Sequence, residues 1–567
     1  MQVEHAFCPR LGKAYAAHTT YCHICISIIT PLHYNYYFLL KVVNKSLKFT
    51  DYTDSHLLKV IQQQSPVLKL AFDVAVIGSE FARVDQFMEL VRNTKVEELS
   101  IFVQTQDFRW CEDMFEGNLY YEFPYSFIPT YKWLQSLTIQ GCKFTCNNLI
   151  NNTAGMFPSL RQLCLSQVML LSNEALSNIS SCCPEIEVIE FSCCSFGITT
   201  LKLSKFPKLK KASVVDLQYG LEYVDITETN LESFQCTSTD MECLISLAAC
   251  SNIRELILSS CCLIETDDNL LGDLATYFPL LEKADLQDVA PFAYSDRIKA
   301  SNSHLRTLKL LFNRAIQVIS VECPNLKHFK YTGYGFEEVY LNCPKLKRFD
   351  YKGSIPRLIL LDLPTDVEYI SFQFDLTSVH HMSWFISLRK FLEQIRGCNN
   401  NVFVHLTNSP DMVEFVLDEL GAVKTFQPNC AHLEVEITNC GVDSNFSAAF
   451  VDGLIWSTLP TTLSVGGDCY DFTKHLCEKL AQKSRDKSCC DRELCNKYWW
   501  HNISDFKVEY KEEDMTHNLA SLVEMCKQSS RDSHVDGLPI GFDFEWHSAE
   551  RFTADLLVEM AGFNNNP

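Results

Sequence analysis

Residues 157–165 read FPSLRQLCL, in which aliphatic side chains recur as L-x-x-L-x-L beginning two residues after a proline. The same proline-led pattern returns as CPEIEVIEF from Cys183, FPKLKKASV from Phe206, FPLLEKADL from Phe278, CPNLKHFKY from Cys323 and CPKLKRFDY from Cys343. Versions without the proline are KVEELSI from Lys95, WLQSLTI from Trp133, NIRELIL from Asn252 and HLRTLKL from His304. The chain is therefore interpreted first as a repeat array.

The spacing of these segments identifies the repeat. When the first aliphatic residue of each segment is taken as its anchor, consecutive anchors lie 20 to 28 residues apart. The anchors are Leu134, Leu160, Ile186, Leu209, Leu231, Ile253, Leu281, Leu305, Leu326 and Leu346. A period of about 20–29 residues is typical of the leucine-rich repeat. The sequence predicts an α/β fold, a leucine-rich-repeat solenoid curved as a horseshoe, and chance leucine periodicity is the weaker interpretation.

The ninth position of each repeat, counted from the anchor, adds a second signal. No single coil can bury its own aliphatic face, so the array is stable only because successive coils stack. A small side chain is needed where the chain turns after the strand. We interpret Cys142, Cys194 and Cys261 as structural cysteines at this position.

Two stretches have half the usual period. Strand-like segments start 10 to 12 residues apart from Ile198, and 10 or 11 residues apart from Leu305. This leaves no room for a helix on the return path. Two-sided β segments are predicted near residues 198–236 and 305–363, with Glu337 and Glu338 on the side opposite the main strands.

Helices are predicted where the spacing is longer. Apolar stripes indicate them at residues 172–183 and 266–278, and Thr239 with Glu242 forms a capping-box pattern before CLISLAAC. In the C-terminal third, LRKFLEQIRG, SAAFVDGLIWS and FTKHLCEKLAQK are predicted helices, whereas NVFVHLT, HLEVEIT, TTLSV and FKVEY are predicted strands.

Composition limits the class of partner. The 567 residues carry 49 basic against 70 acidic side chains, a net charge of −21. This argues against nucleic acid and anionic membranes as partners.

The 27 cysteines include adjacent pairs and suit a reduced compartment, so we expect a cytoplasmic or nuclear location. The apolar run at residues 24–43 is broken by Pro31 and is not expected to span a membrane.

No reaction chemistry stands out. Cys22 and Cys25 have zinc-like spacing without a second pair, and His380-His381 has no nearby ligand run. Gly466-Gly467 lacks the lysine and the spaced glycines of a phosphate loop. We expect no catalytic residues, no metal and no cofactor, and hence no enzyme activity.

A basic patch is the strongest candidate site. Outward positions on the coils anchored at Leu305, Leu326 and Leu346 should stack about one strand spacing apart, roughly 4.8 Å. They include Arg306, Lys309, Lys327, His328, Lys330, Lys347 and Arg348. This basic face could bind an acidic or phosphorylated peptide or a small anion, and the alternative is an ordinary solvated Lys/Arg ladder.

With the repeats placed, the chain resembles the repeat region of plant F-box/leucine-rich-repeat proteins. The resemblance runs over about residues 45–512 and rests on VDQFMELVRNTKVEELSIFV from Val84, SNEALSNISSCCPEIEVIEF from Ser172, DGLIWSTLPTTLSVGG from Asp452 and KYWWHNISDFKVEY from Lys497. It implies a substrate receptor of a Skp–cullin–F-box ubiquitin ligase, in which the repeats hold a protein substrate. The F-box that would bind the Skp adaptor and cullin is not recognisable in residues 1–44, so those partners follow only if an F-box is restored.

The expected organisation has four parts. Residues 1–44 form an N-terminal segment, interpreted as disordered or as a gene-model artefact; residues 45–380 form the solenoid. Residues 381–512 carry irregular repeats, and residues 513–567 form a cap or tail. The predicted function is non-catalytic protein interaction, and the alternatives are a free-standing scaffold without a ubiquitin role and a small-molecule or anion receptor.

Overall fold

A computed structural model gives the fold of this chain over a defined set of residues. It describes residues 24–29, 67–76, 85, 96–105, 121–122, 132–144, 157–170, 179–196, 199–217, 221–226, 229–238, 243–246, 250–264, 274–290, 296–356, 358–362, 364, 367–376, 383–395, 400–406, 430–437, 444–467, 470–485, 499–510 and 540–546. The chain divides into two compact units. The first comprises Met1–Ile253 with Ser260–Glu265, and the second comprises Arg254–Ser259 with Thr266–Pro567.

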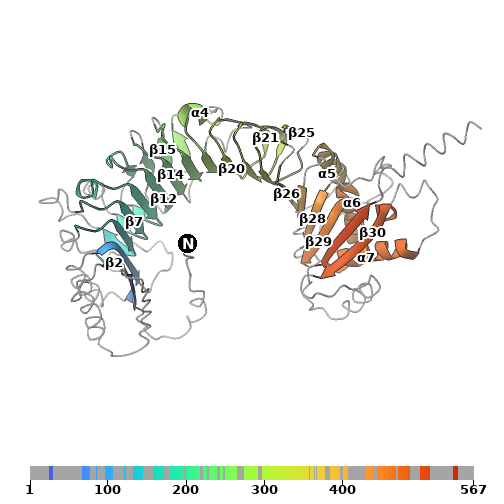
Figure 1. Cartoon of the computed structure of the whole chain (residues 1–567), viewed down its shortest axis with the longest axis horizontal. Helices are drawn as coiled ribbons and strands as arrows, with labels where there is room; N and C mark the ends of the chain where they lie inside the picture. Colours follow the sequence, from blue (N-terminus) through green and yellow to red (C-terminus); the bar gives the residue numbers. More distant parts are fainter. Residues whose placement is uncertain are drawn as a thin grey trace, which may run out of the picture. The chain divides into compact units, whose positions relative to one another are not determined.

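The first unit is built on a ladder of parallel strands, one from each coil (Figure 1). In order, these are β2 (Val67–Val76), β3 (Val96–Thr105), β5 (Ser136–Gln140), β7 (Gln162–Ser166), β9 (Val188–Ser192), β12 (Lys211–Leu217) and β14 (Ser233–Ser238). Strand β1 (Ile24–Ile29) pairs antiparallel with β2.

Shorter parallel strands follow the turns of the same unit. One group is β4 (Tyr121–Glu122), β6 (Cys142–Phe144), β8 (Met169–Leu170) and β10 (Ser195–Phe196). The other is β11 (Thr200–Lys202), β13 (Tyr223–Asp225), β15 (Leu244–Ser246) and β17 (Cys262–Ile264). Strands therefore occupy both sides of these coils, as the half period near residues 198–236 predicts.

The second unit repeats this arrangement. Its main parallel ladder contains β16 (Glu255–Ser259), β18 (Lys283–Gln287), β20 (Thr307–Phe312), β22 (His328–Gly333), β24 (Arg348–Lys352), β26 (Tyr369–Leu376), β27 (Asn400–Leu406), β28 (Cys430–Ile437) and β29 (Pro460–Gly467). A second parallel sheet contains β19 (Arg297–Ser301), β21 (Ile316–Glu322), β23 (Phe336–Asn342) and β25 (Leu358–Asp362). Glu337 and Glu338 lie on β23, apart from the main ladder, as predicted.

Helices and two antiparallel strands complete the second unit. The helices are α4 (Leu274–Tyr277), α5 (Ser383–Gln394), α6 (Ser444–Thr458), α7 (Tyr470–Arg485) and the 3-10 helix η6 (Trp499–Asn502). Strand β31 (Ile540–Trp546) pairs antiparallel with both β29 and β30 (Ile503–Tyr510). The predicted helices and strands of the C-terminal third are confirmed.

The core consists of aligned aliphatic and aromatic side chains. Strand β7 alternates half-buried and buried residues, and Leu137, Leu163 and Ile189 stand in register with exposed fractions of 2%, 2% and 0%. In the second unit Phe329 stacks on Phe349, with ring centroids 5.4 Å apart. Full burial of such a side chain contributes about 1.5–3 kcal/mol, so each coil gains stability only with a neighbour beside it. The leucine-rich-repeat solenoid is confirmed.

One local prediction is wrong. The capping-box pattern at Thr239–Glu242 predicts a helix over CLISLAAC, yet Leu244–Ser246 form strand β15, which pairs with β13 and β17. Pairing on both edges overrides the local helix signal. The predicted helices at residues 172–183 and 266–278 fall mostly outside the described residues, which show helix at 179–182 and at Leu274–Tyr277.

Candidate protein-binding surfaces

The basic face lies on three adjacent strands of the second unit. His328 on β22 stands in register with Arg348 on β24, and Lys330 with Lys309 on β20. The residue just after each anchor is also aligned, because the Lys327 amide donates to the Arg306 carbonyl and the Lys347 amide to the Lys327 carbonyl, both at 2.8 Å. The structure thus brings all seven predicted side chains onto consecutive coils.

Acidic side chains pair with four of these seven side chains. Arg306 lies 3.4 Å from Glu282 and Lys309 lies 3.3 Å from Asp285. The remaining two pairs are Lys347 with Glu368 at 3.2 Å and Arg348 with Asp350 at 2.6 Å. The hydrogen bond from Asp350 raises the pKa of Arg348. The guanidinium of Arg348 also lies over the Tyr369 ring, 4.7 Å from its centroid.

Lys327 and Lys330 are left without an ion-pair partner among the residues that the structure describes. Both are exposed, and exposed His328 lies between them in sequence. We call Lys327, His328 and Lys330 the basic coil. Sequence reasoning found these residues but missed the acids that distinguish them from their neighbours. Those acids could have been found by comparing equivalent positions of the flanking repeats.

The residues directly after the anchors, here called the leading positions, show why charge remains at this coil. In the first unit they read Gln135, which is neutral, then Arg161, Glu187, Lys210, Glu232, and in the second Arg254, Glu282, Arg306, Lys327, Lys347, Glu368. Signs alternate in each series until Arg306, Lys327 and Lys347 follow one another. Lys327 therefore has a cation on both sides where every earlier coil of the second unit has an acid beside a base.

The three cysteines assigned to the turn share one environment. Cys142, Cys194 and Cys261 each have 0% exposure. Each follows a residue with positive φ, namely Gly141 at 72°, Cys193 at 52° and Ser260 at 51°. The Cys194 thiol donates to the Leu165 carbonyl at 3.2 Å, and burial raises the pKa of this thiol to about 12. Burial also raises the pKa of Cys142.

Sequence reasoning missed that valine also occupies the ninth position of the repeat. Val168 follows Gln167 (φ 51°) and Val289 follows Asp288 (φ 47°), with exposures of 1% and 0%. Shape, rather than thiol chemistry, is therefore what this position requires. A search for any small apolar side chain at position nine could have found both valines.

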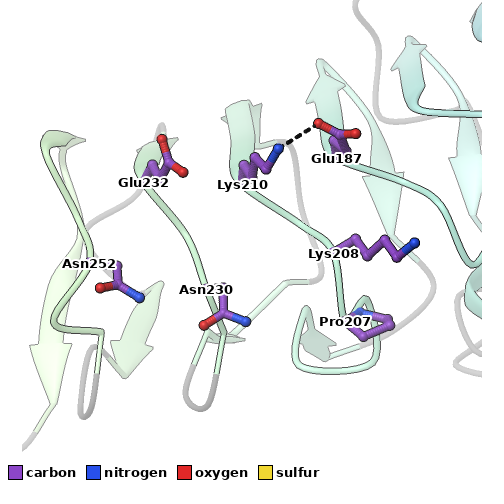
Figure 2. A pocket seen from close by; sticks show the side chains of 7 residues that line it. All are labelled: Glu187, Pro207, Lys208, Lys210, Asn230, Glu232 and Asn252. Atoms are coloured by element: carbon purple, nitrogen blue, oxygen red, sulfur yellow. Dashed lines mark hydrogen bonds and ion pairs between the residues drawn. The ribbon is translucent and has the colours of Figure 1, made fainter.

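A second feature, a hollow of about 290 Å³, lies on the first unit. Figure 2 shows Glu187, Lys210 and Glu232 along one side of it, and Asn230 and Asn252 along the other. Lys210 lies 2.9 Å from Glu187; this hydrogen bond lowers the pKa of Glu187 and raises the pKa of Lys210. No sequence pattern had indicated a binding site here.

Other predicted ligand residues cannot be placed. Cys22, the side chain of Cys25 and the pair His380-His381 lie outside the described residues. Within the described part of the chain, no group of three or more His, Cys, Asp or Glu side chains is arranged to hold a metal ion. Among those same residues, no helix combines the length and apolar character needed to cross a membrane.

Stacked parallel strands with an inward aliphatic face and an outward polar face define a leucine-rich-repeat protein. Residues 62–313 match the family model described as "At1g61320/AtMIF1, LRR domain", so this part of the chain is similar to a leucine-rich-repeat domain. The matched range includes Arg306 and Lys309, whereas the basic coil lies C-terminal to this range in the sequence. No curated protein matches the chain.

Proposed function

We propose that this solenoid is a non-catalytic protein-interaction module that binds an acidic segment of a partner protein at the basic coil. The observation that carries the proposal is the break in charge alternation at Lys327. Repeat arrays present their outward positions as extended binding surfaces. The side chains at these positions do not pack in the core.

The chemistry of the basic coil suits carboxylate or phosphate groups. Lys327 and Lys330 present exposed ammonium groups, and exposed His328, which lies between them in sequence, adds a ring nitrogen. Hydrogen bonds between such cations and an anion are shorter and stronger than neutral ones. The exposed ion pairs around them contribute only about 0–1 kcal/mol each, so Arg306 and Lys347 can turn toward a ligand at small cost.

The test is a charge reversal, Lys327→Glu with Lys330→Glu, in the full chain. Fluorescence anisotropy would follow fluorescein-labelled Glu-Gly repeats and the same peptide with phosphoserine. We expect at least a tenfold loss of affinity, about 1.4 kcal/mol. The matched control is Lys390→Glu with Lys507→Glu, which makes the same charge change at two exposed lysines on α5 and β30. Equal loss in both variants, or no loss in the first, would reject the basic coil as the site.

A finer proposal follows from the resemblance to F-box proteins. The partner would be a substrate of a Skp–cullin–F-box ubiquitin ligase, held by the repeats in the cytoplasm or nucleus. Support comes from the quoted sequence runs and from the matched repeat domain. The test is co-purification of the full chain with a Skp adaptor, and failure to co-purify would favour a free-standing scaffold. Native mass spectrometry that found a retained small molecule would favour a receptor instead.

A further inference from the structure

The hollow on the first unit lies where the chain turns inward at three successive anchors. Leu209, Leu231 and Ile253 have 0% exposure, so the residues before and after them project outward. The residues before the last two anchors are Asn230 and Asn252, and the residue after Leu231 is Glu232. Neighbouring coils are about 4.8 Å apart, which places these polar groups around one small space.

Most of the charge in the hollow is already paired. Lys208 lies 2.6 Å from Glu185, and Lys210 lies 2.9 Å from Glu187. Glu232, in contrast, has no ion-pair partner among the residues that the structure describes, and it is exposed. With Glu185 counted as the partner of Lys208, three acids lie beside two lysines here, an excess of one negative charge. Lys210 is raised in pKa first by its hydrogen bond with Glu187 and to a smaller extent by the charge of Glu232. The lining also contains the ring of Pro207.

The side-chain amides of two asparagines add hydrogen-bond acceptors to the carboxylate of Glu232. Asn230 and Asn252 are exposed, and within the described ranges their amides have no hydrogen-bond partner. A carboxylate with two amide oxygens offers several acceptors in a small space. The planar guanidinium group of arginine carries five N–H donors in a fixed fork, whereas an ammonium group is a compact point charge.

We propose that this hollow receives an arginine side chain of a partner protein, with Glu232 as its counter-ion and Asn230 and Asn252 as hydrogen-bond acceptors. Pro207 packs beside the aliphatic stem. This site is independent of the basic coil: it lies on the other unit and selects the opposite charge. Failure of either proposal leaves the other intact.

The experiment uses an array of nine-residue peptides with uncharged random flanks and a central Arg, Lys, Gln or Leu, probed with the full chain. We expect arginine-centred peptides to bind about tenfold more strongly than leucine-centred ones. Glu232→Gln should remove this preference, and Asn230→Ala with Asn252→Ala should weaken it.

The matched control is Glu222→Gln. Glu222 is also exposed, has no ion-pair partner in the described part of the chain, and directly precedes a strand, β13, of the sheet that also contains β11, β15 and β17 in the first unit. It should leave the arginine preference unchanged. Equal binding of lysine-centred peptides, no arginine preference in the unchanged chain, or a preference that survives Glu232→Gln would each overturn the proposal.

Discussion

Individual residues at the strand-to-turn junction control the repeat geometry. Gly141 adopts φ 72°, donates its amide hydrogen to the Ser166 carbonyl at 3.1 Å, and faces the carbonyl oxygen of Val103. A Cβ atom at this position would overlap that oxygen. The same positive φ occurs at Cys193 and Ser260, so the turn accepts other residues only where the neighbouring backbone leaves space.

We predict that Gly141→Ala lowers the free energy of unfolding of the first unit by more than about 1 kcal/mol, because the substitution adds both backbone strain and a clash. Urea denaturation followed by circular dichroism would measure it. Gly466→Ala is the control, since a Cβ there meets no atom within 4 Å. An unchanged midpoint for Gly141→Ala would contradict the prediction.

Because several thiols are buried, we predict that the free energy of unfolding falls at alkaline pH. Burial raises the pKa of Cys194, Cys323 and Cys430 to about 12 and that of Cys343 to about 11. The folded state then keeps protons that the unfolded state loses above about pH 9, so stability is present below that pH and falls as pH rises toward 12. The urea midpoint should drop between pH 8.5 and pH 11 under reducing conditions, and Cys194→Val should reduce that drop. A urea midpoint that does not change between pH 8.5 and pH 11 would contradict this prediction.

At the scale of elements, one buried carboxylate links the helices of the second unit. Asp452 on α6 is 5% exposed, and its Oδ1 accepts from Trp499 Nε1 on η6 at 3.0 Å. His475 Nε2 on α7 lies 3.3 Å from the same oxygen. Arg389 on α5 donates to the Trp456 carbonyl of α6 at 3.2 Å, and its guanidinium lies 4.3 Å from the Trp456 ring centroid. These contacts fix helices that have no backbone ladder between them.

We predict that Asp452→Leu destabilises these helices by about 1–3 kcal/mol, because the Trp499 donor is left buried without an acceptor. Asp452→Asn should cost less, since one amide oxygen can still accept. Tryptophan fluorescence during denaturation would measure both. Glu545→Gln, at an exposed position on β31, is the control and should have little effect. Equal stability of Asp452→Leu and the unchanged chain would contradict the assignment.

At the scale of the whole molecule, net charge opposes the proposed ligand. The chain carries −21, so an acidic peptide is repelled at long range even though the basic coil attracts it at short range. Raising the ionic strength from 0.01 M to 0.15 M shortens the Debye length from about 30 Å to about 8 Å. We predict that the association rate of the Glu-Gly peptide rises over this range, measured by stopped-flow fluorescence. A falling rate would show that the local cations dominate from the start.

The spacing of aliphatic residues in the sequence is enough to predict the strands. These side chains can be buried only when successive coils stack with their strands side by side. This holds for the anchors from Leu134 to Leu346 and for the doubled sheets. It fails at Thr239–Glu242, where a local helix signal competes with the strand pairing of β15, which residues outside the segment supply. For the same reason the basic side chains of the candidate site could be found from the sequence, but most of their ion pairs could not. A lysine can be identified in the sequence, but the acids that pair with Arg306, Lys309 and Lys347 lie 21 to 24 residues away, and the stacking of the coils brings them within 4 Å. Arg348, in contrast, pairs with Asp350 on its own strand.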